Sequence, residues 1–458
     1  MKKVFLIIIL YLFVSFISIA AGGDAQDAAA GHADPVVPVL IYFSIILLAA
    51  KLGGEIFERI NQPAVLGELL FGVILGNLGL IIPGYNLFDA LRVEHITEHW
   101  AIVINSIASI GVIILLFEVG FESTLSDMKK VGTSSFLVAT VGVICPFILG
   151  YIVSNIFIQE VPETILKMAP NFAIYNIHIF IGATLCVTSV GITARVLQDM
   201  NLIQAKESRI VIGAAIIDDI MGLLILAVVS NMIISAETGA EFNAVTILTT
   251  ALYSILFLVL AVFLGMRYVS KLFHVFTKMR IQGMLLIASL LFCFVLSILA
   301  NLVGLATIIG ASVAGLILEE SHFKGFKDSI RLEQYLKPIA SIFVPVFFIQ
   351  MGVQVRLETF LDPSVFGIAF CLIVAAFVGK QFCSIGVVEK GLNRAFIGVG
   401  MVPRGEVGLI FAGIGKALNV IDDGLFSAIV IMVMVTTLIT PPLLKLTWKK
   451  FKGSYHVE

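Results

Sequence analysis

The chain has 458 residues, of which 59% are hydrophobic and 13% are charged. Because soluble domains carry about 25% charged residues, this composition excludes an ordinary soluble protein and favours a polytopic membrane protein. The formal net charge of −2 excludes the strongly basic character on which phosphate-backbone binding depends, and we expect no nucleic-acid partner.

The N-terminus has the three parts of a secretory signal peptide. Met1-Lys2-Lys3 is the charged region, residues 4–16 form the apolar region, and Ser18 and Ala20 place small side chains at the −3 and −1 positions of a cleavage site. We therefore expect a signal peptide over residues 1–22, with an uncleaved first helix as the alternative.

Thirteen apolar spans follow, and a helix of about 20 such residues crosses the hydrocarbon core of a bilayer. The sequence therefore predicts an all-α polytopic membrane protein with thirteen transmembrane helices. The spans cover residues 36–52, 63–82, 101–121, 132–156, 177–198, 208–234, 245–267, 282–302, 304–320, 336–354, 364–388, 395–417 and 424–444.

The distribution of Lys and Arg gives the orientation of the spans. If the chain starts outside, the connections after odd-numbered spans face the cytoplasm, and these connections hold most of the Lys and Arg. The outer connections hold only Arg92, Lys167 and Arg356. Because Lys and Arg accumulate in cytoplasmic loops, we expect a protein of the cytoplasmic membrane with its N-terminus outside and its C-terminus in the cytoplasm.

The chain also contains a weak internal repeat. The third span ends in residues 116–122, Leu-Phe-Glu-Val-Gly-Phe-Glu, and the tenth ends in residues 348–354, Phe-Ile-Gln-Met-Gly-Val-Gln. If spans one to six correspond to spans eight to thirteen, the seventh span is a connector and the second copy is inverted. Inverted repeats of this kind are typical of secondary transporters.

Two adjacent aspartates, Asp218 and Asp219, lie in the middle of the sixth span. A charge near the bilayer midplane costs about 2.5 to 17 kcal/mol, depending on the method. Ionisable residues at this depth usually mark an ion or proton path, so the sequence predicts such a path at these two carboxylates.

Spans five and twelve both carry residues that disfavour a continuous helix. Thr188 and Thr193 bring hydroxyls that can bond freed backbone groups. In span twelve, Pro403 lacks an N–H group, and we expect a break over residues 401–405. Arg404 would then lie by the negative end of one half-helix and Glu406 by the positive end of the next; the alternative is a structural ion pair between two helices.

Lys380 is a second intramembrane charge, deep in span eleven at about the depth of the aspartates. A buried lysine beside a carboxylate can stay charged, whereas an isolated one loses its proton readily. We expect Lys380 to pair with one aspartate while the other faces a cavity, because adjacent residues on a helix point about 100° apart. The alternative is a lysine that extends to the membrane surface.

Taken in order, these motifs resemble the cation/proton antiporter superfamily over residues 36–445. The resemblance is to its monovalent cation:proton antiporter-2 family, which includes NapA-like sodium/proton antiporters and the membrane domains of Kef-type proteins. The matching segments are residues 62–68 (Gln-Pro-Ala-Val-Leu-Gly-Glu), 117–122, 188–197, Asp218-Asp219, Gly379-Lys380 and 400–408.

The resemblance implies a role for each site residue. Asp219 matches the carboxylate that binds the transported Na⁺ or proton, and Asp218 matches its neighbour in electrogenic members, paired with a lysine matched by Lys380. Thr188 and Thr193 fall in the matching unwound stretch. No cofactor is implied; the partners are a monovalent cation, a proton, the lipid bilayer and a second copy of the chain in a homodimer.

The resemblance also implies a division of the chain into functional parts. Two sets of helices would form the dimerisation scaffold, and two sets that unwind and cross beside the aspartates would form the ion-carrying core. The parts are scaffold helices over 36–121 and 282–354, core helices over 132–234 and 364–444, a linker helix over 245–267 and a cytoplasmic tail over 445–458.

We therefore expect an antiporter that exchanges Na⁺ or Li⁺ for protons, is electrogenic and works by alternating access around Asp219. Exchange of K⁺ for protons and ion-coupled uptake of an organic solute remain as alternatives. An enzyme is not expected, because an intramembrane aspartyl protease needs two aspartates that face each other and share a proton, which adjacent residues of one helix cannot do.

Overall fold

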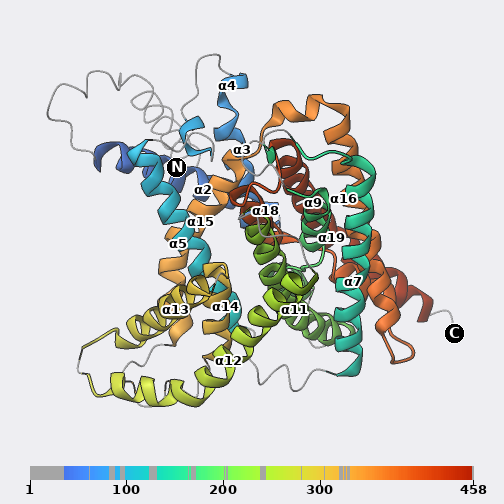
Figure 1. Cartoon of the computed structure of the whole chain (residues 1–458). Helices are drawn as coiled ribbons and strands as arrows, with labels where there is room; N and C mark the ends of the chain where they lie inside the picture. The colour runs from blue at the N-terminus through green and yellow to red at the C-terminus, as the bar shows by residue number, and fades with distance from the viewer. Residues whose placement is uncertain are drawn as a thin grey trace, which may run out of the picture. The chain divides into compact units, whose positions relative to one another are not determined.

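The computed structural model describes the chain in segments. The described residues are 36–60, 62–81, 88–92, 98–122, 132–162, 165–166, 172–200, 202, 205–237, 244–279, 281–303, 305–318, 323, 326 and 331–455. The signal peptide expected over residues 1–22 lies outside them. The elements of the described chain are α-helices and short 3-10 helices, coloured in chain order in Figure 1.

The chain divides into two compact units. The first consists of Met1–Ile114 and Lys337–Glu358, and the second of Leu115–Leu336 and Thr359–Glu458. The first unit contains α2 (Val36–Arg59), α3 (Ala64–Gly76), α4 (Leu78–Ile81), η2 (Asp89–Leu91), most of α5 (His99–Glu122) and most of α15 (Leu332–Val353).

The second unit holds the remaining helices. They are α7 (Thr133–Phe157), α9 (Ile174–Thr184), α10 (Val190–Asp199), α11 (Lys206–Glu237), α12 (Ala244–Thr277), α13 (Met284–Leu302), α14 (Thr307–Ile317), η5 (Leu357–Leu361, at the boundary), α16 (Pro363–Phe382), η6 (Cys383–Gly386), α17 (Arg394–Gly400), α18 (Gly405–Ala417) and α19 (Asp423–Tyr455).

Within the described residues, nine helices are long and apolar enough to cross a membrane. These are α2, α5, α7, α11, α12, α13, α15, α16 and α19. Four shorter apolar helices, α3, α9, α14 and the part of α18 from Val407 to Ala417, have 10–17 residues each. Each of the thirteen spans expected from the sequence overlaps one of these helices.

Several helices continue beyond the apolar spans that mark them. Helix α12 ends at Thr277, and α19 runs to Tyr455, through most of the expected tail over residues 445–458. Hydropathy marks the part of a helix that hydrocarbon can cover, whereas Lys and Leu continue a helix well on either side of that limit. Pro441 and Pro442 lie inside α19 and do not end it.

Close helix contacts in the first unit depend on glycines of α3 and α15. A Cβ added to Gly72 would lie 2.2 Å from the carbonyl oxygen of Ile349, and one added to Gly352 would lie 2.3 Å from that of Leu69. Small residues let helix backbones approach in this way, and they are the usual means of packing helices in lipid.

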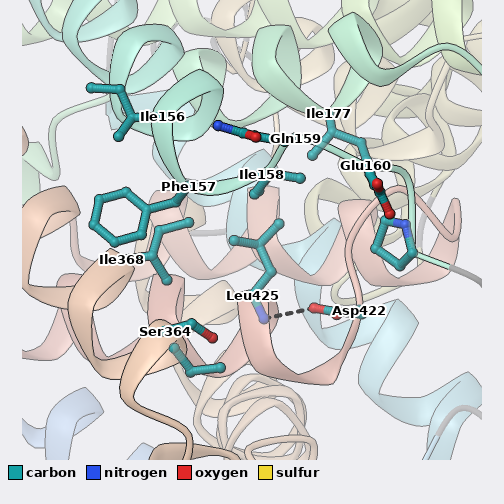
Figure 2. Close-up of a pocket in the computed structure, with 12 residues that line it drawn as sticks. Ile156, Phe157, Ile158, Gln159, Glu160, Ile177, Ser364, Ile368, Asp422 and Leu425 are labelled. Carbon is teal, nitrogen blue, oxygen red and sulfur yellow. Dashed lines mark hydrogen bonds between the residues drawn. The ribbon is translucent and has the colours of Figure 1, made fainter.

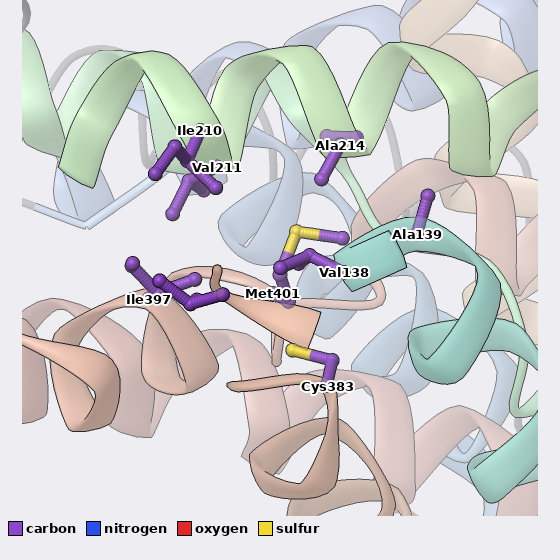
Figure 3. Close-up of a cluster of buried hydrophobic side chains, with 10 residues drawn as sticks. Val138, Ala139, Ile210, Val211, Ala214, Cys383, Ile397 and Met401 are labelled. Carbon is purple, nitrogen blue, oxygen red and sulfur yellow. The ribbon is translucent and has the colours of Figure 1, made fainter. Parts of the chain in front are cut away.

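In the second unit, α7 packs against α9, α11 and α16. A buried apolar cluster joins α7, α11, η6 and α17 and fixes their spacing (Figure 3). The cluster consists of Val138, Ala139, Ile210, Val211, Ala214, Ala215, Cys383, Val387, Ile397 and Met401.

Candidate functional site

Asp218 and Asp219 lie near the middle of α11, and both are buried. Their side chains are 0% and 9% exposed, and α11 extends from Lys206 to Glu237. A buried carboxylate needs a partner, because its removal from water is costly.

Lys380 of α16 supplies that partner for Asp218. Its Nζ lies 2.9 Å from Asp218 Oδ1, and both side chains are fully buried. The other oxygen, Oδ2, has no hydrogen-bond partner among the described residues. The structure thus joins α11 and α16 through a buried ion pair, and Lys380 does not extend to a surface.

Room for the lysine comes from a glycine on α7. A Cβ added to Gly142 would lie 3.6 Å from Lys380 Nζ and 3.3 Å from the Cβ of Cys383. Pro146, one turn later in α7, contacts Gly379, where an added Cβ would lie 2.8 Å from the proline Cα. A methyl group at residue 142 would therefore be in ordinary van der Waals contact with Lys380 Nζ and in tight contact with Cys383.

Two interrupted helices flank the aspartates. Residues 185–189 separate α9 from α10, and residues 401–404 separate α17 from α18. Along α11, a Cβ at Gly222 would meet Val187 of the first break at 2.4 Å, while Val211 would meet a Cβ at Gly400 at 2.9 Å. Asp218 and Asp219 therefore lie between the place where α11 touches the first break and the place where it touches the end of α17.

The two breaks are also bonded to each other. Ser189 N–H donates to the carbonyl of Pro403 over 2.8 Å. Thr188 Oγ1 donates to the carbonyl of Met401 over 3.1 Å, and Thr193 Oγ1 donates to that of Gly400 over 2.8 Å. The threonine hydroxyls thus occupy carbonyls left free at the end of α17, and their oxygens keep lone pairs that can accept or coordinate.

The side chain of Arg404 binds the first break, residues 185–189, and α16 rather than the end of α17. Its Nη1 donates to the carbonyl of Val187 over 2.8 Å, and its Nη2 donates to the carbonyl of Ala376 in α16 over 3.1 Å. The guanidinium is fully buried and interacts electrostatically with Asp218. Its positive charge lies by the carboxyl end of α9, where the helix dipole is negative.

Glu406 is the second residue of α18. Its side chain lies outside the described residues, so its expected role at the positive end of α18 stays a prediction.

Substitution of Gly405 by alanine is expected to impair folding and transport together. Gly405 has a φ of +42°, and an added Cβ would lie 2.6 Å from both the Cβ and the Oγ of Ser189. Left-handed backbone at a non-glycine residue costs about 1–3 kcal/mol, and the overlap adds to this cost. The Gly405→Ala variant should show a lowered midpoint of thermal unfolding in detergent. The control is Gly132→Ala, which should keep the midpoint, because Gly132 is exposed and an added Cβ there meets nothing within 4 Å.

A separate pocket lies at one end of the second unit (Figure 2). It has a volume of about 510 Å³ and is lined by the end of α7, the segment after it, Ile177 of α9 and the first turns of α16 and α19. Asp422 at this pocket accepts a hydrogen bond from the backbone of Leu425. None of the residues predicted from the sequence as site residues lines it.

Sequence reasoning missed one contributor to this site. Thr437 of α19 is fully buried, and its Oγ1 accepts a hydrogen bond from the backbone N–H of Gly405 over 3.2 Å. The signal was present in the sequence as Thr436-Thr437 and Thr440 before Pro441-Pro442, a polar cluster in an apolar helix.

The comparisons with known proteins agree with this architecture. Residues 42–450 match the family model described as "Sodium/hydrogen exchanger, transmembrane". The chain is 37% identical over 442 residues to the high-affinity Na⁺/H⁺ antiporter NhaS3 of Synechocystis, with 90% of each chain covered. It is 30% identical over 409 residues to the Na⁺/H⁺-K⁺ antiporter GerN of Bacillus cereus, with coverage of 88% of this chain and 95% of GerN.

A solved structure shows the same fold. The sodium/proton antiporter MjNhaP1 of Methanocaldococcus jannaschii matches with a TM-score of 0.62 at 16% identity, over 91% of this chain and 98% of that one. The relatives are multi-pass membrane transporters rather than enzymes. The chain therefore belongs to the sodium/hydrogen exchanger family of cation/proton antiporters.

Proposed function

We propose that this protein exchanges Na⁺ or Li⁺ for protons and that Asp219 binds both substrates in turn. The observation that carries the proposal is that the two adjacent aspartates have different surroundings. Lys380 holds Asp218 in a fully buried ion pair, so we assign the substrates to Asp219, the next residue of α11, which is itself buried at 9% exposure.

Competition at one carboxylate couples the two fluxes. A proton and a sodium ion each neutralise Asp219, and oxygen ligands suit a hard cation. The carbonyls of the two breaks and the hydroxyl oxygens of Thr188 and Thr193 are such ligands close to α11. If the core crosses the membrane only with a proton or a cation bound at Asp219, it cannot return empty. Each crossing with a cation in one direction then requires a crossing with a proton in the other.

We also propose that exchange is electrogenic. Lys380 and Asp218 form a pair that can open when the cation binds, so that the lysine gives up its proton as well. Two protons would then be exchanged for one cation, and one net charge would cross the membrane in each cycle.

The proposed topology counts the nine long helices and the four short ones as thirteen spans. The helix pairs α9–α10 and α17–α18 would be two interrupted spans that cross beside Asp219. The N-terminus would lie outside and the C-terminus in the cytoplasm of the cytoplasmic membrane, as the distribution of Lys and Arg indicates. Core helices over 132–234 and 364–444 would move against scaffold helices over 36–121 and 282–354 in each subunit of a homodimer.

A second candidate, exchange of K⁺ for protons, is favoured by the likeness to GerN, a Na⁺/H⁺-K⁺ antiporter. The likeness to NhaS3, a Na⁺/H⁺ antiporter, is greater, at 37% against 30% identity. Sodium is therefore the cation that we propose.

A transport assay in proteoliposomes separates these candidates. After a pH gradient has been imposed, addition of sodium or lithium chloride should dissipate it, and choline chloride should not. Dissipation by potassium alone would assign the protein to K⁺/H⁺ exchange. Failure of all cations with folded protein would favour the remaining alternative, ion-coupled solute uptake, which uptake of labelled solutes would then reveal.

A further inference from the structure

Helix α18 begins without the usual cap. The first N–H groups of a helix have no partner inside it, and a side chain at the N-cap residue commonly accepts from one of them. Here the N-cap residue is Arg404, which has no side-chain acceptor. Its guanidinium donates instead to Val187 and Ala376.

A threonine from another helix supplies the missing acceptor. Thr437 Oγ1 of α19 accepts from Gly405 N–H over 3.2 Å, and Thr437 is fully buried. Gly405 is the residue with a φ of +42° that lies against Ser189 of the first break. The hydroxyl therefore fixes the point at which the two breaks meet.

The neighbouring threonines of α19 act within their own helix. Thr436 Oγ1 donates to the carbonyls of Met432 and Val433, and Thr440 Oγ1 donates to that of Thr436. Both are as well buried as Thr437, with exposures of 2% and 0%. They provide matched controls with the same side chain in the same helix.

A proline lies one turn beyond this contact. Pro441, inside α19, has no N–H, so the carbonyl of Thr437 lacks its usual helical donor. Helices bend most readily at such points. The residue that holds Gly405 thus lies where α19 can deform without breaking further hydrogen bonds.

We propose that Thr437 is a positioning residue of the exchange reaction: its hydroxyl holds the start of α18 so that Arg404 stays bound to the carbonyls of Val187 and Ala376. The proposal rests on the proposed function, because it assigns Thr437 an effect on cation binding at Asp219. Loss of the hydroxyl should misplace the break and weaken cation binding, while turnover at saturating cation persists.

The test compares sodium-driven proton exchange by the wild type, Thr437→Val, Thr437→Ser and Thr440→Val in proteoliposomes. Valine keeps the shape of threonine and removes the acceptor, and serine keeps the acceptor. We expect Thr437→Val to raise the KM for sodium several-fold with kcat within twofold of the wild type. Thr437→Ser and Thr440→Val should keep the wild-type KM. KM does not depend on the amount of folded protein, so reduced yield does not hide the effect.

Three outcomes would overturn the proposal. A KM in Thr437→Val equal to that of Thr440→Val would remove the special role of Thr437, and an equal rise in Thr437→Ser would show that the hydroxyl is not the cause. If Thr437→Val does not fold, Thr437→Ala replaces it in both comparisons. Absence of cation-driven proton movement in the wild type would reject the proposed function itself, and the role of Thr437 with it.

Discussion

Replacement of Asp219 by asparagine is expected to abolish cation-driven proton exchange and to leave a folded protein. Asparagine has nearly the same shape as aspartate but cannot ionise, so the site can neither release a proton nor neutralise Na⁺. We expect the initial rate to fall by about 100-fold or more, equivalent to about 2.7 kcal/mol. The measurement is fluorescence of a pH-sensitive dye in vesicles after addition of sodium chloride.

The control for this variant is Glu160→Gln, which makes the same chemical change at an exposed carboxylate of the separate pocket. Its rate should equal that of the wild type. The melting temperature of Asp219→Asn in detergent should not fall, because removal of an ionised group from a buried site relieves the cost of its desolvation. Retained sodium-dependent exchange in Asp219→Asn would reject Asp219 as the binding carboxylate.

The helical class and the position of the apolar spans could be predicted from the sequence, because hydropathy acts locally. A run such as residues 282–302 must be buried in lipid or protein wherever it lies, and α13 covers it. The ends of the helices were less predictable. α19 continues to Tyr455 past Lys449-Lys450, since charged residues with good helix propensity extend a helix after the apolar span ends.

The charged residues of the candidate site could be predicted from the sequence for a similar reason. Asp218 and Lys380 are costly in an apolar span, and two opposite charges buried at similar depth lower that cost by pairing. The hydrogen-bond partners of Arg404 could not be predicted from the sequence. Its bonds to Val187 and Ala376 depend on how two breaks far apart in the sequence meet, and local patterns carry no information on that meeting.

Removal of Lys380 is expected to have the second large effect, on stability and on charge coupling together. In Lys380→Met the carboxylate of Asp218 stays buried without the lysine charge. Removal of one member of a buried ion pair lowers the free energy of unfolding by about 3–5 kcal/mol. The unfolding midpoint in detergent should therefore fall clearly. The double variant Asp218→Leu, Lys380→Met should recover much of the loss, because apolar replacement of both partners leaves no unpaired buried charge.

The effect on coupling separates a transport role for Lys380 from a purely structural one. If Lys380 releases a proton in each cycle, Lys380→Met exchanges one proton for one cation and moves no net charge. A charge that crosses 100 mV gains or loses about 2.3 kcal/mol, so an imposed potential should change the wild-type rate and leave the Lys380→Met rate unaffected. Lys416→Met, which removes the partner of Asp423 at the end of α18, should lower stability but keep the dependence on potential. Full dependence on potential in Lys380→Met would assign the lysine a structural role alone, because the net charge would then cross the membrane by another residue.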